Sequence, residues 1–347
     1  MATFNRRRFF GVASTAGVAA ATSQGVALAS GRDARGPNLV GVQAENGASV
    51  IAQNYLDPRT VDITIDSIAL GHTASVRISL PHRFGSRPRA SWPVLYLLHG
   101  GYGDYLDWTR HSDIARLSRE RDVLVVMPDG GELGFYTDWW ARGVGNKPGW
   151  ETFHLVELSQ ILVRGLRAAD RRAIAGLSMG GFGAMSYAAR HPGLFRAAAS
   201  FSGTLDTLHP TVEPVSPDPY ATWLLRTHMA PNGYDPLGLF GDPTAQRAVW
   251  AAHNPADLVK NLRDTKLFVS CGNGRIGPLD PPGTDPSDVS VRFEASQLLQ
   301  NREFVKRASS LELDVAFETY GGSHTWPYWA REFDKAFPLL MEAIEAG

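Results

Sequence analysis

Residues 173–183 read Ala-Ile-Ala-Gly-Leu-Ser-Met-Gly-Gly-Phe-Gly, and this stretch decides the fold. It begins as a short apolar strand, and residues 184–190 after it suit a helix. The Gly-x-Ser-x-Gly pattern between them predicts a sharp turn that strains the backbone of Ser178 and exposes its hydroxyl. Glycines flank the serine because a Cβ there would clash where strand and helix meet. We expect Ser178 to be a nucleophile; the alternative is a tight turn with an inert serine.

Apolar patterning on both sides of this turn predicts a sheet. Residues 94–98 and 123–127 are continuous apolar runs, typical of strands buried on both faces. Residues 61–70 and 74–80 alternate and predict an opening antiparallel hairpin. Further strands are expected at 197–201, 266–271 and 313–318, and helices at 153–166, 291–309 and 326–346. This alternation predicts an α/β fold with a mostly parallel, doubly wound sheet and ligands at the carboxyl ends of its strands.

Composition narrows the class of protein. The chain has 347 residues, 44% of them hydrophobic, which is enough for one large domain. A net charge of −1 offers no basic surface for nucleic acid or anionic membranes. The single cysteine, Cys271, excludes an intrachain disulfide and is expected to be a small buried residue rather than a second nucleophile. No metal-ligand spacing, phosphate loop or dinucleotide fingerprint occurs, so we expect no metal and no cofactor.

The N-terminus is typical of an exported protein. Residues 5–11 read Asn-Arg-Arg-Arg-Phe-Phe-Gly, and a mildly apolar run follows. Paired arginines before this run resemble a twin-arginine signal, with cleavage expected after Ala29. The alternative, a membrane anchor, is disfavoured because Thr, Gln and Gly interrupt the run. We therefore expect residues 1–29 to be a signal peptide, the twin-arginine machinery to be a partner, and the mature protein to be secreted without stable membrane insertion.

The rest of the chain divides into two parts, and the second part carries an insertion. Residues 30–57 lack clear periodicity and are expected to form a loose mature N-terminus, followed by the folded domain at 58–347. Within it, residues 203–247 are rich in Pro and Gly yet carry large apolar side chains. We interpret 203–247 as a cap inserted over the carboxyl edge of the sheet. The alternative is a packed surface insertion without substrate contact.

A serine nucleophile needs a base, and the base needs an orienting acid. His324 directly follows the last predicted strand and is the expected base. Four other histidines lie downstream of Ser178, in a helix end, the cap and a helix–loop segment: His191, His209, His228 and His253.

The acid is expected in the loop after the strand at 266–271. Asp280 is the preferred candidate, with Asp285 and Asp288 as competitors that would also suit turn formation and helix capping. Glu294 comes next, although it falls on the helix predicted at 291–309.

An oxyanion intermediate needs two backbone N–H donors, and losing one costs roughly 10²–10³ in rate. One donor is expected to be Met179, directly after the nucleophile. The other is expected at Gly101 or Tyr102, in the loop after the strand at 94–98.

Several segments resemble the esterase D branch of the α/β-hydrolases, and within it the secreted mycobacterial mycolyltransferases of the antigen 85 type. The matching segments are 127–139, 150–153, 176–179, 271–274 and 323–329. The resemblance implies an α/β-hydrolase fold and a Ser/Glu-or-Asp/His triad acting through an acyl-enzyme. It also implies oxyanion donors at Gly101 and Met179 and a position for Trp326 beside the histidine. We expect Tyr102 and Trp326 to contact the substrate.

Two features depart from the mycolyltransferase pattern. His99 stands where that family has an aspartate that holds trehalose, so 99–101 resembles the ordinary esterase loop. The acid loop is longer, and we find no glutamate at the matching spacing.

The sequence thus predicts a secreted carboxylic ester hydrolase that acts on a small-molecule or lipid ester, with Ser178 as nucleophile, His324 as base and Asp280 as orienting acid. The first alternative is an acyltransferase that moves the acyl group to a sugar or glycerol hydroxyl. The apolar cap and the aromatic segment 326–329 would suit a lipid chain, unless those aromatics only pack the last helix. A second alternative is a non-catalytic binding protein on the same fold.

Overall fold

The computed structural model describes residues 36–140 and 148–345, so the expected signal segment 1–29 lies outside the described residues. Within the described ranges the chain forms a nine-stranded sheet in the order β1-β2-β3-β5-β4-β6-β7-β8-β9. β1 to β3 are antiparallel, β3 also pairs antiparallel with β5, and the remaining neighbours are parallel. The strands are β1 Ser49–Tyr55, β2 Thr60–Ser67, β3 His72–Ser79, β4 Trp92–Leu98, β5 Leu124–Pro128, β6 Ala168–Leu177, β7 Ala197–Phe201, β8 Lys266–Gly272 and β9 Val315–Tyr320.

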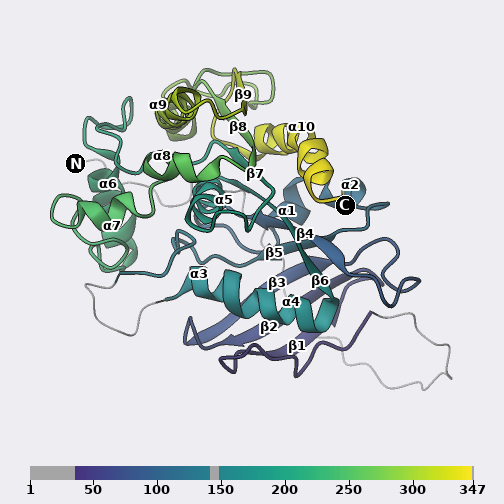
Figure 1. The fold of residues 1–347 in the computed structure, drawn as a ribbon. Coiled ribbons are helices and arrows are strands. Elements are labelled where there is room, and N and C mark those ends of the chain that lie inside the picture. Colours follow the sequence, from purple (N-terminus) through teal and green to yellow (C-terminus); the bar gives the residue numbers. More distant parts are fainter. Residues whose placement is uncertain (1–35, 141–147, 346–347) are drawn as a thin grey trace, which may run out of the picture.

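Helices cover both faces of the sheet. The described helices are α1 Asp107–His111, α2 Ile114–Leu117, α3 Trp150–Thr152, η2 Phe153–Leu158, α4 Ser159–Leu166, α5 Met179–Arg190, α6 Tyr220–Leu224, η3 Leu225–Met229, η4 Ala230–Asn232, α7 Arg247–Ala251, α8 Pro255–Leu258, η5 Val259–Leu262, α9 Val289–Ser310 and α10 Trp326–Glu345. α1, α2 and α10 pack together on one face, whereas α4, α5, α9 and the cap segment 203–247 pack on the other (Figure 1).

Strand β4 shows why its sequence is continuously apolar. Leu95 and Leu97 point into the core under α10, and Val94 and Tyr96 point into the core under α5. All of β4 is buried because both faces are covered. The predicted mostly parallel, doubly wound sheet is therefore confirmed.

The N-terminal segment differs from the prediction. Residues 30–57 are not uniformly loose, because β1 lies within them and pairs with β2 along its length. β1 escapes sequence analysis because it is an edge strand with a register irregularity after Val50 and exposes Ile51. It therefore lacks the alternating pattern that marks a half-buried strand.

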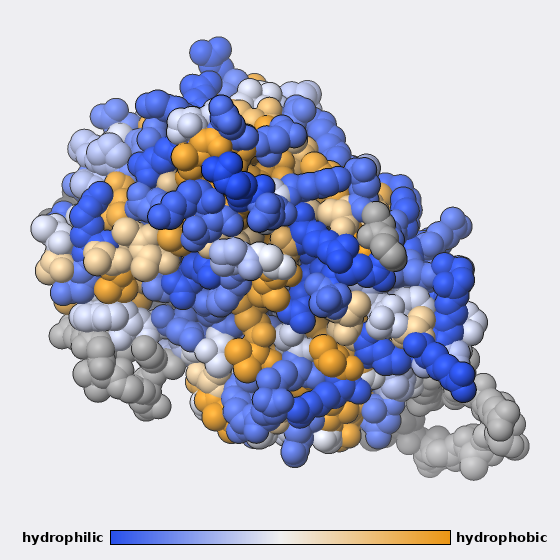
Figure 2. Space-filling model, viewed as in Figure 1, coloured by the Kyte–Doolittle hydropathy of each residue, from blue (hydrophilic) through white to orange (hydrophobic). Residues whose placement is uncertain are grey.

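The visible surface is mixed in polarity. Figure 2 shows hydrophobic groups in patches separated by hydrophilic ones. Across 36–140 and 148–345, the helices include none with the length and apolar character needed to span a bilayer.

Candidate active site

Ser178 occupies the turn between β6 and α5 in the strained geometry that the sequence predicts. Its backbone angles are φ 52° and ψ −119°, in a region that side-chain-bearing residues rarely adopt. A Cβ on Gly176 would overlap the carbonyl oxygen of Gly180, and a Cβ on Gly180 would overlap that of Leu98. The two glycines thus let strand and helix approach closely enough to hold the serine at the apex.

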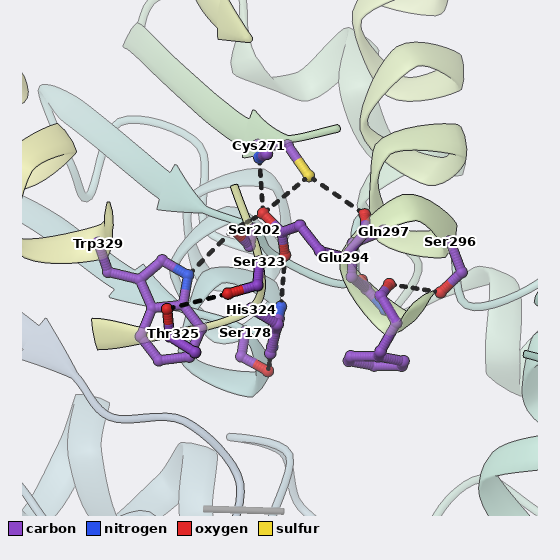
Figure 3. Close-up of polar contacts among 12 residues, drawn as sticks. Ser178, Ser202, Cys271, Glu294, Ser296, Gln297, Ser323, His324, Thr325 and Trp329 are labelled. Atoms are coloured by element: carbon purple, nitrogen blue, oxygen red, sulfur yellow. Dashed lines mark hydrogen bonds and ion pairs between the residues drawn. The ribbon is translucent and has the colours of Figure 1, made fainter. Parts of the chain in front are cut away.

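His324 links Ser178 to a carboxylate. The Ser178 hydroxyl donates to His324 Nε2 at 2.9 Å, and His324 Nδ1 donates to Glu294 Oε2 at 2.6 Å (Figure 3). His324 is 4% exposed and Glu294 is fully buried. This order of groups can activate a hydroxyl, because the imidazole accepts its proton while the carboxylate fixes the tautomer and stabilises the imidazolium.

The second oxygen of Glu294 is also fully engaged. Glu294 Oε1 accepts from the Gly272 N–H and from the Ser202 hydroxyl, both at 2.6 Å. The Trp329 indole N–H donates to Ser202 Oγ at 3.0 Å and holds that hydroxyl in place. Cys271 Sγ lies 3.6 Å from the same carboxylate oxygen, and burial raises the pKa of this thiol well above its usual value. Cys271 is therefore an inert buried residue, as predicted.

The prediction that Asp280 orients the histidine is wrong. Asp280 Oδ2 accepts from the Gly277 N–H at 2.7 Å and from the Tyr328 hydroxyl at 2.9 Å, and its Oδ1 accepts from the Ser323 hydroxyl. These contacts fasten the loop that carries His324. Asp280 thus holds the loop that carries His324 without contacting its ring, and Glu294 is the acid that hydrogen-bonds to the imidazole.

The sequence places Asp280 before Glu294 because the acid is expected in a loop, whereas Glu294 projects from the second turn of α9. One pattern in the sequence does point to Glu294. Val291, Glu294 and Leu298 share one buried face of that helix, so a carboxylate stands in an apolar stripe. Asp285 and Asp288 form the turn that leads into α9.

The other downstream histidines have different hydrogen-bond partners. These are Glu151 for His191, the Thr211 carbonyl for His209, the Tyr102 hydroxyl for His228 and the Val249 carbonyl for His253. Of the five candidates, it is His324 that the fold brings to Ser178.

The structure removes one of the three candidate N–H donors for the oxyanion. The Tyr102 N–H donates to the Glu132 carbonyl at 2.8 Å, so it is not available to a ligand. Met179 opens α5, and the N–H groups of a helix's first turn have no acceptor within the helix. Gly101 and Met179 both line a hollow together with Ser178, and they remain the predicted donor pair.

Two hollows lie beside Ser178 and His324 and share Gly101 and Tyr102 in their walls. The first, which we call the cap hollow, has a volume of about 40 Å³ and is bounded by Ser178, Met179 and cap residues that include Tyr220, Trp223 and His228. Residues of the 203–247 segment thus border the same hollow as Ser178, which favours the interpretation of this segment as a cap. The second, which we call the histidine cleft, has a volume of about 220 Å³ and is bounded by His324, Trp326 and the 100–103 loop. Tyr102 lines both hollows, and Trp326 lines only the cleft.

Fold and site together define an α/β-hydrolase. Residues 67–340 match the family "Esterase", described as "Putative esterase", and the chain belongs to this family.

Curated relatives carry two kinds of name. "Esterase Rv1288" of Mycobacterium tuberculosis is 30% identical over 291 residues, which is 81% of this chain and 59% of that protein. The chain thus spans well under two thirds of that relative's length. "Diacylglycerol acyltransferase/mycolyltransferase Ag85B" of Mycobacterium intracellulare is 31% identical over 279 residues, covering 74% of this chain and 76% of that one.

Solved structures share the fold. Mycobacterium tuberculosis MPT51 (FbpC1) superposes with a TM-score of 0.63 at 24% identity, covering 80% of this chain and 96% of that one. An S-formylglutathione hydrolase from Agrobacterium tumefaciens gives a TM-score of 0.62 at 18% identity, with coverage of 85% and 99%.

The geometry predicts which acid supports Ser178. Glu294→Gln is expected to slow the reaction of Ser178 with a fluorophosphonate by about 10³–10⁴-fold, because the amide holds the wrong imidazole tautomer. Asp280→Asn, a matched change in the neighbouring loop, is expected to cost far less. Labelling rates measured by intact-protein mass spectrometry check both. Equal losses, or a larger loss at Asp280, would contradict the assignment of Glu294.

Proposed function

We propose that this protein is a serine carboxylic ester hydrolase that acts through an acyl-enzyme. The observation that carries the proposal is the unbroken hydrogen-bond chain from Ser178 through His324 to Glu294. Membership of the Esterase family and the names of the relatives support the same chemistry.

The first half of the reaction forms the acyl-enzyme. Ser178 Oγ attacks the ester carbonyl carbon as its proton passes to His324 Nε2, and the carbonyl oxygen becomes an oxyanion. The N–H groups of Gly101 and Met179 would stabilise that charge. His324 then gives its proton to the ester oxygen, the bond from carbon to that oxygen breaks, and the alcohol leaves.

Water completes the cycle. His324 Nε2 takes a proton from the water as the water oxygen attacks the acyl carbon. The same proton then returns to Ser178 Oγ when the second tetrahedral intermediate breaks down, and the carboxylic acid is released. Throughout, the Glu294 carboxylate keeps Nδ1 protonated and stabilises the imidazolium.

Acyl transfer is the second candidate, since a sugar or glycerol hydroxyl could replace water in the last step. The name of the Ag85B relative favours it. The position of His99 favours hydrolysis. Its ring is buried, with Nδ1 donating to the Gly100 carbonyl at 2.7 Å and Nε2 accepting from the Gly130 N–H at 2.8 Å. His99 therefore braces the loop and presents no polar group to a sugar.

The catalytic assignment predicts the effect of two truncations. Ser178→Ala and His324→Ala are each expected to lower the hydrolysis of p-nitrophenyl acetate by about 10⁴–10⁶-fold with unchanged circular dichroism. Product formation with and without added glycerol separates hydrolysis from acyl transfer. Retention of more than a tenth of the wild-type rate by either variant would refute the triad, and a wild type inert under both conditions would favour the binding-protein alternative.

We also propose that the chain is exported by the twin-arginine route, on the basis of residues 5–11 and the small residues before Ser30. Replacing Arg6, Arg7 and Arg8 by Lys keeps the charge but removes the paired arginines. In a host with this route, wild type is expected in the medium with Ser30 as its first residue, and the triple variant is expected to stay inside the cell uncleaved. Equal export of both would contradict the proposal. N-terminal sequencing and immunoblotting of the two fractions provide the measurement.

A further inference from the structure

We propose that the cap hollow receives the acyl group of the ester, that Trp223 limits this group to a short chain, and that the histidine cleft receives a bulkier alcohol. The proposal rests on the function proposed above and adds the substrate class: short-chain acyl esters of a large alcohol.

The proton transfer from His324 determines which hollow receives the acyl group and which receives the alcohol. The ester oxygen must collect a proton from His324 Nε2, so the alcohol has to leave on the side of the histidine. His324 and Thr325 line the histidine cleft. Ser178 and Met179, which would hold the acyl carbon and its oxyanion, line the cap hollow. The acyl chain therefore extends toward the cap and the alcohol toward Trp326.

The two volumes differ about fivefold. The cap hollow, at about 40 Å³, is the smaller of the two. A hollow of this size suits a short acyl chain, from acetyl to butyryl. The histidine cleft, at about 220 Å³, accommodates a ring or a branched alcohol.

Trp223 forms one wall of the cap hollow. Its ring stacks on Phe293 with centroids 5.4 Å apart and 28° between planes. Phe293 in turn meets His324 edge-on at 4.8 Å. Trp223 is only 6% exposed, so its ring is held in place by the surrounding cap. Phe293 is held against the catalytic imidazole, so of this stacked pair Trp223 is the side chain that can be changed without disturbing the triad.

Hydrogen bonds link the cap segment around Trp223 to the 100–103 loop, which carries the expected oxyanion donor Gly101. Asn232 Nδ2 donates to the Tyr102 hydroxyl at 2.9 Å, and that hydroxyl donates to His228 Nδ1 at 2.9 Å. Burial lowers the pKa of His228 to about 4, so its ring is neutral near pH 7 and its nitrogen can accept. Trp223 packs against the same ring at 4.8 Å. The cap therefore does not retreat freely to admit a long chain.

The histidine cleft offers an aromatic surface to the alcohol. Trp326 stacks with His111 at 5.0 Å and 29°, and the Asp107 side chain lies on the same wall. Trp326 and His111 also border a larger surface hollow of about 570 Å³, so the cleft continues outward. An alcohol larger than the acyl group can extend into it.

The acyl side is tested with p-nitrophenyl esters from acetate to octanoate. Wild type is expected to prefer acetate to butyrate, with kcat/KM falling by about tenfold or more at octanoate. Trp223→Leu is expected to move the optimum to a chain at least two carbons longer, and the milder Trp223→Phe to move it less. Tyr234→Leu is the matched control, because Tyr234 is a cap aromatic that packs at a tilt against Trp139 and borders neither hollow.

The alcohol side is tested with one acyl group and two alcohols. Trp326→Ala is expected to raise KM for phenyl acetate about tenfold more than KM for methyl acetate. Its acyl-length profile is expected to match wild type. Trp223→Leu is expected to show the reverse pattern, with a changed acyl profile and an unchanged ratio between the two acetates.

The outcomes separate this inference from the proposed function. An active wild type that prefers octanoate, or a Trp223→Leu variant that is folded and has the wild-type profile, overturns the division of the ester and leaves the hydrolase assignment standing. A wild type that hydrolyses no ester and whose Ser178 does not react with a fluorophosphonate overturns both.

Discussion

The hydrogen bond from His324 to Glu294 is the interaction on which the site depends. A buried carboxylate is costly unless its oxygens are paired. Here Oε2 accepts from His324, and Oε1 accepts from Gly272 and Ser202. The same carboxylate therefore joins α9, the end of β8, the loop after β7 and the loop before α10. With those four segments fixed, the other ring nitrogen of His324 can meet the serine.

The parallel sheet explains why these groups meet. β6, β7, β8 and β9 are consecutive neighbours with the same direction, so their carboxyl ends share one edge. Ser178 follows β6, Ser202 follows β7, Gly272 ends β8 and His324 follows β9. The strained backbone of Ser178 and the left-handed φ of 50° at Ser202 occur where the chain turns away from that edge. The site is thus a property of strand order as much as of the individual side chains.

Features set by a short contiguous stretch of sequence can be predicted from that sequence. Ser178 and its two flanking glycines form a contiguous pattern, and His324 follows the last strand directly, so both were predicted. Glu294 was ranked below Asp280 because a helical position was weighed against it, although the first turns of a helix point side chains at the same edge as the preceding loop. Segment 49–55 was missed for a different reason. An irregular edge strand leaves most of its side chains exposed or half-buried and carries no alternation.

A crystal structure of the ethyl phosphonate adduct on Ser178 would test the central claim most directly. The tetrahedral phosphorus mimics the intermediate of ester cleavage. The phosphonyl oxygen is expected to lie within about 3.1 Å of the Gly101 and Met179 nitrogens. His324 is expected to remain hydrogen-bonded to Glu294. A phosphonyl oxygen turned away from both nitrogens, or a His324 separated from Glu294 in the adduct, would contradict this claim.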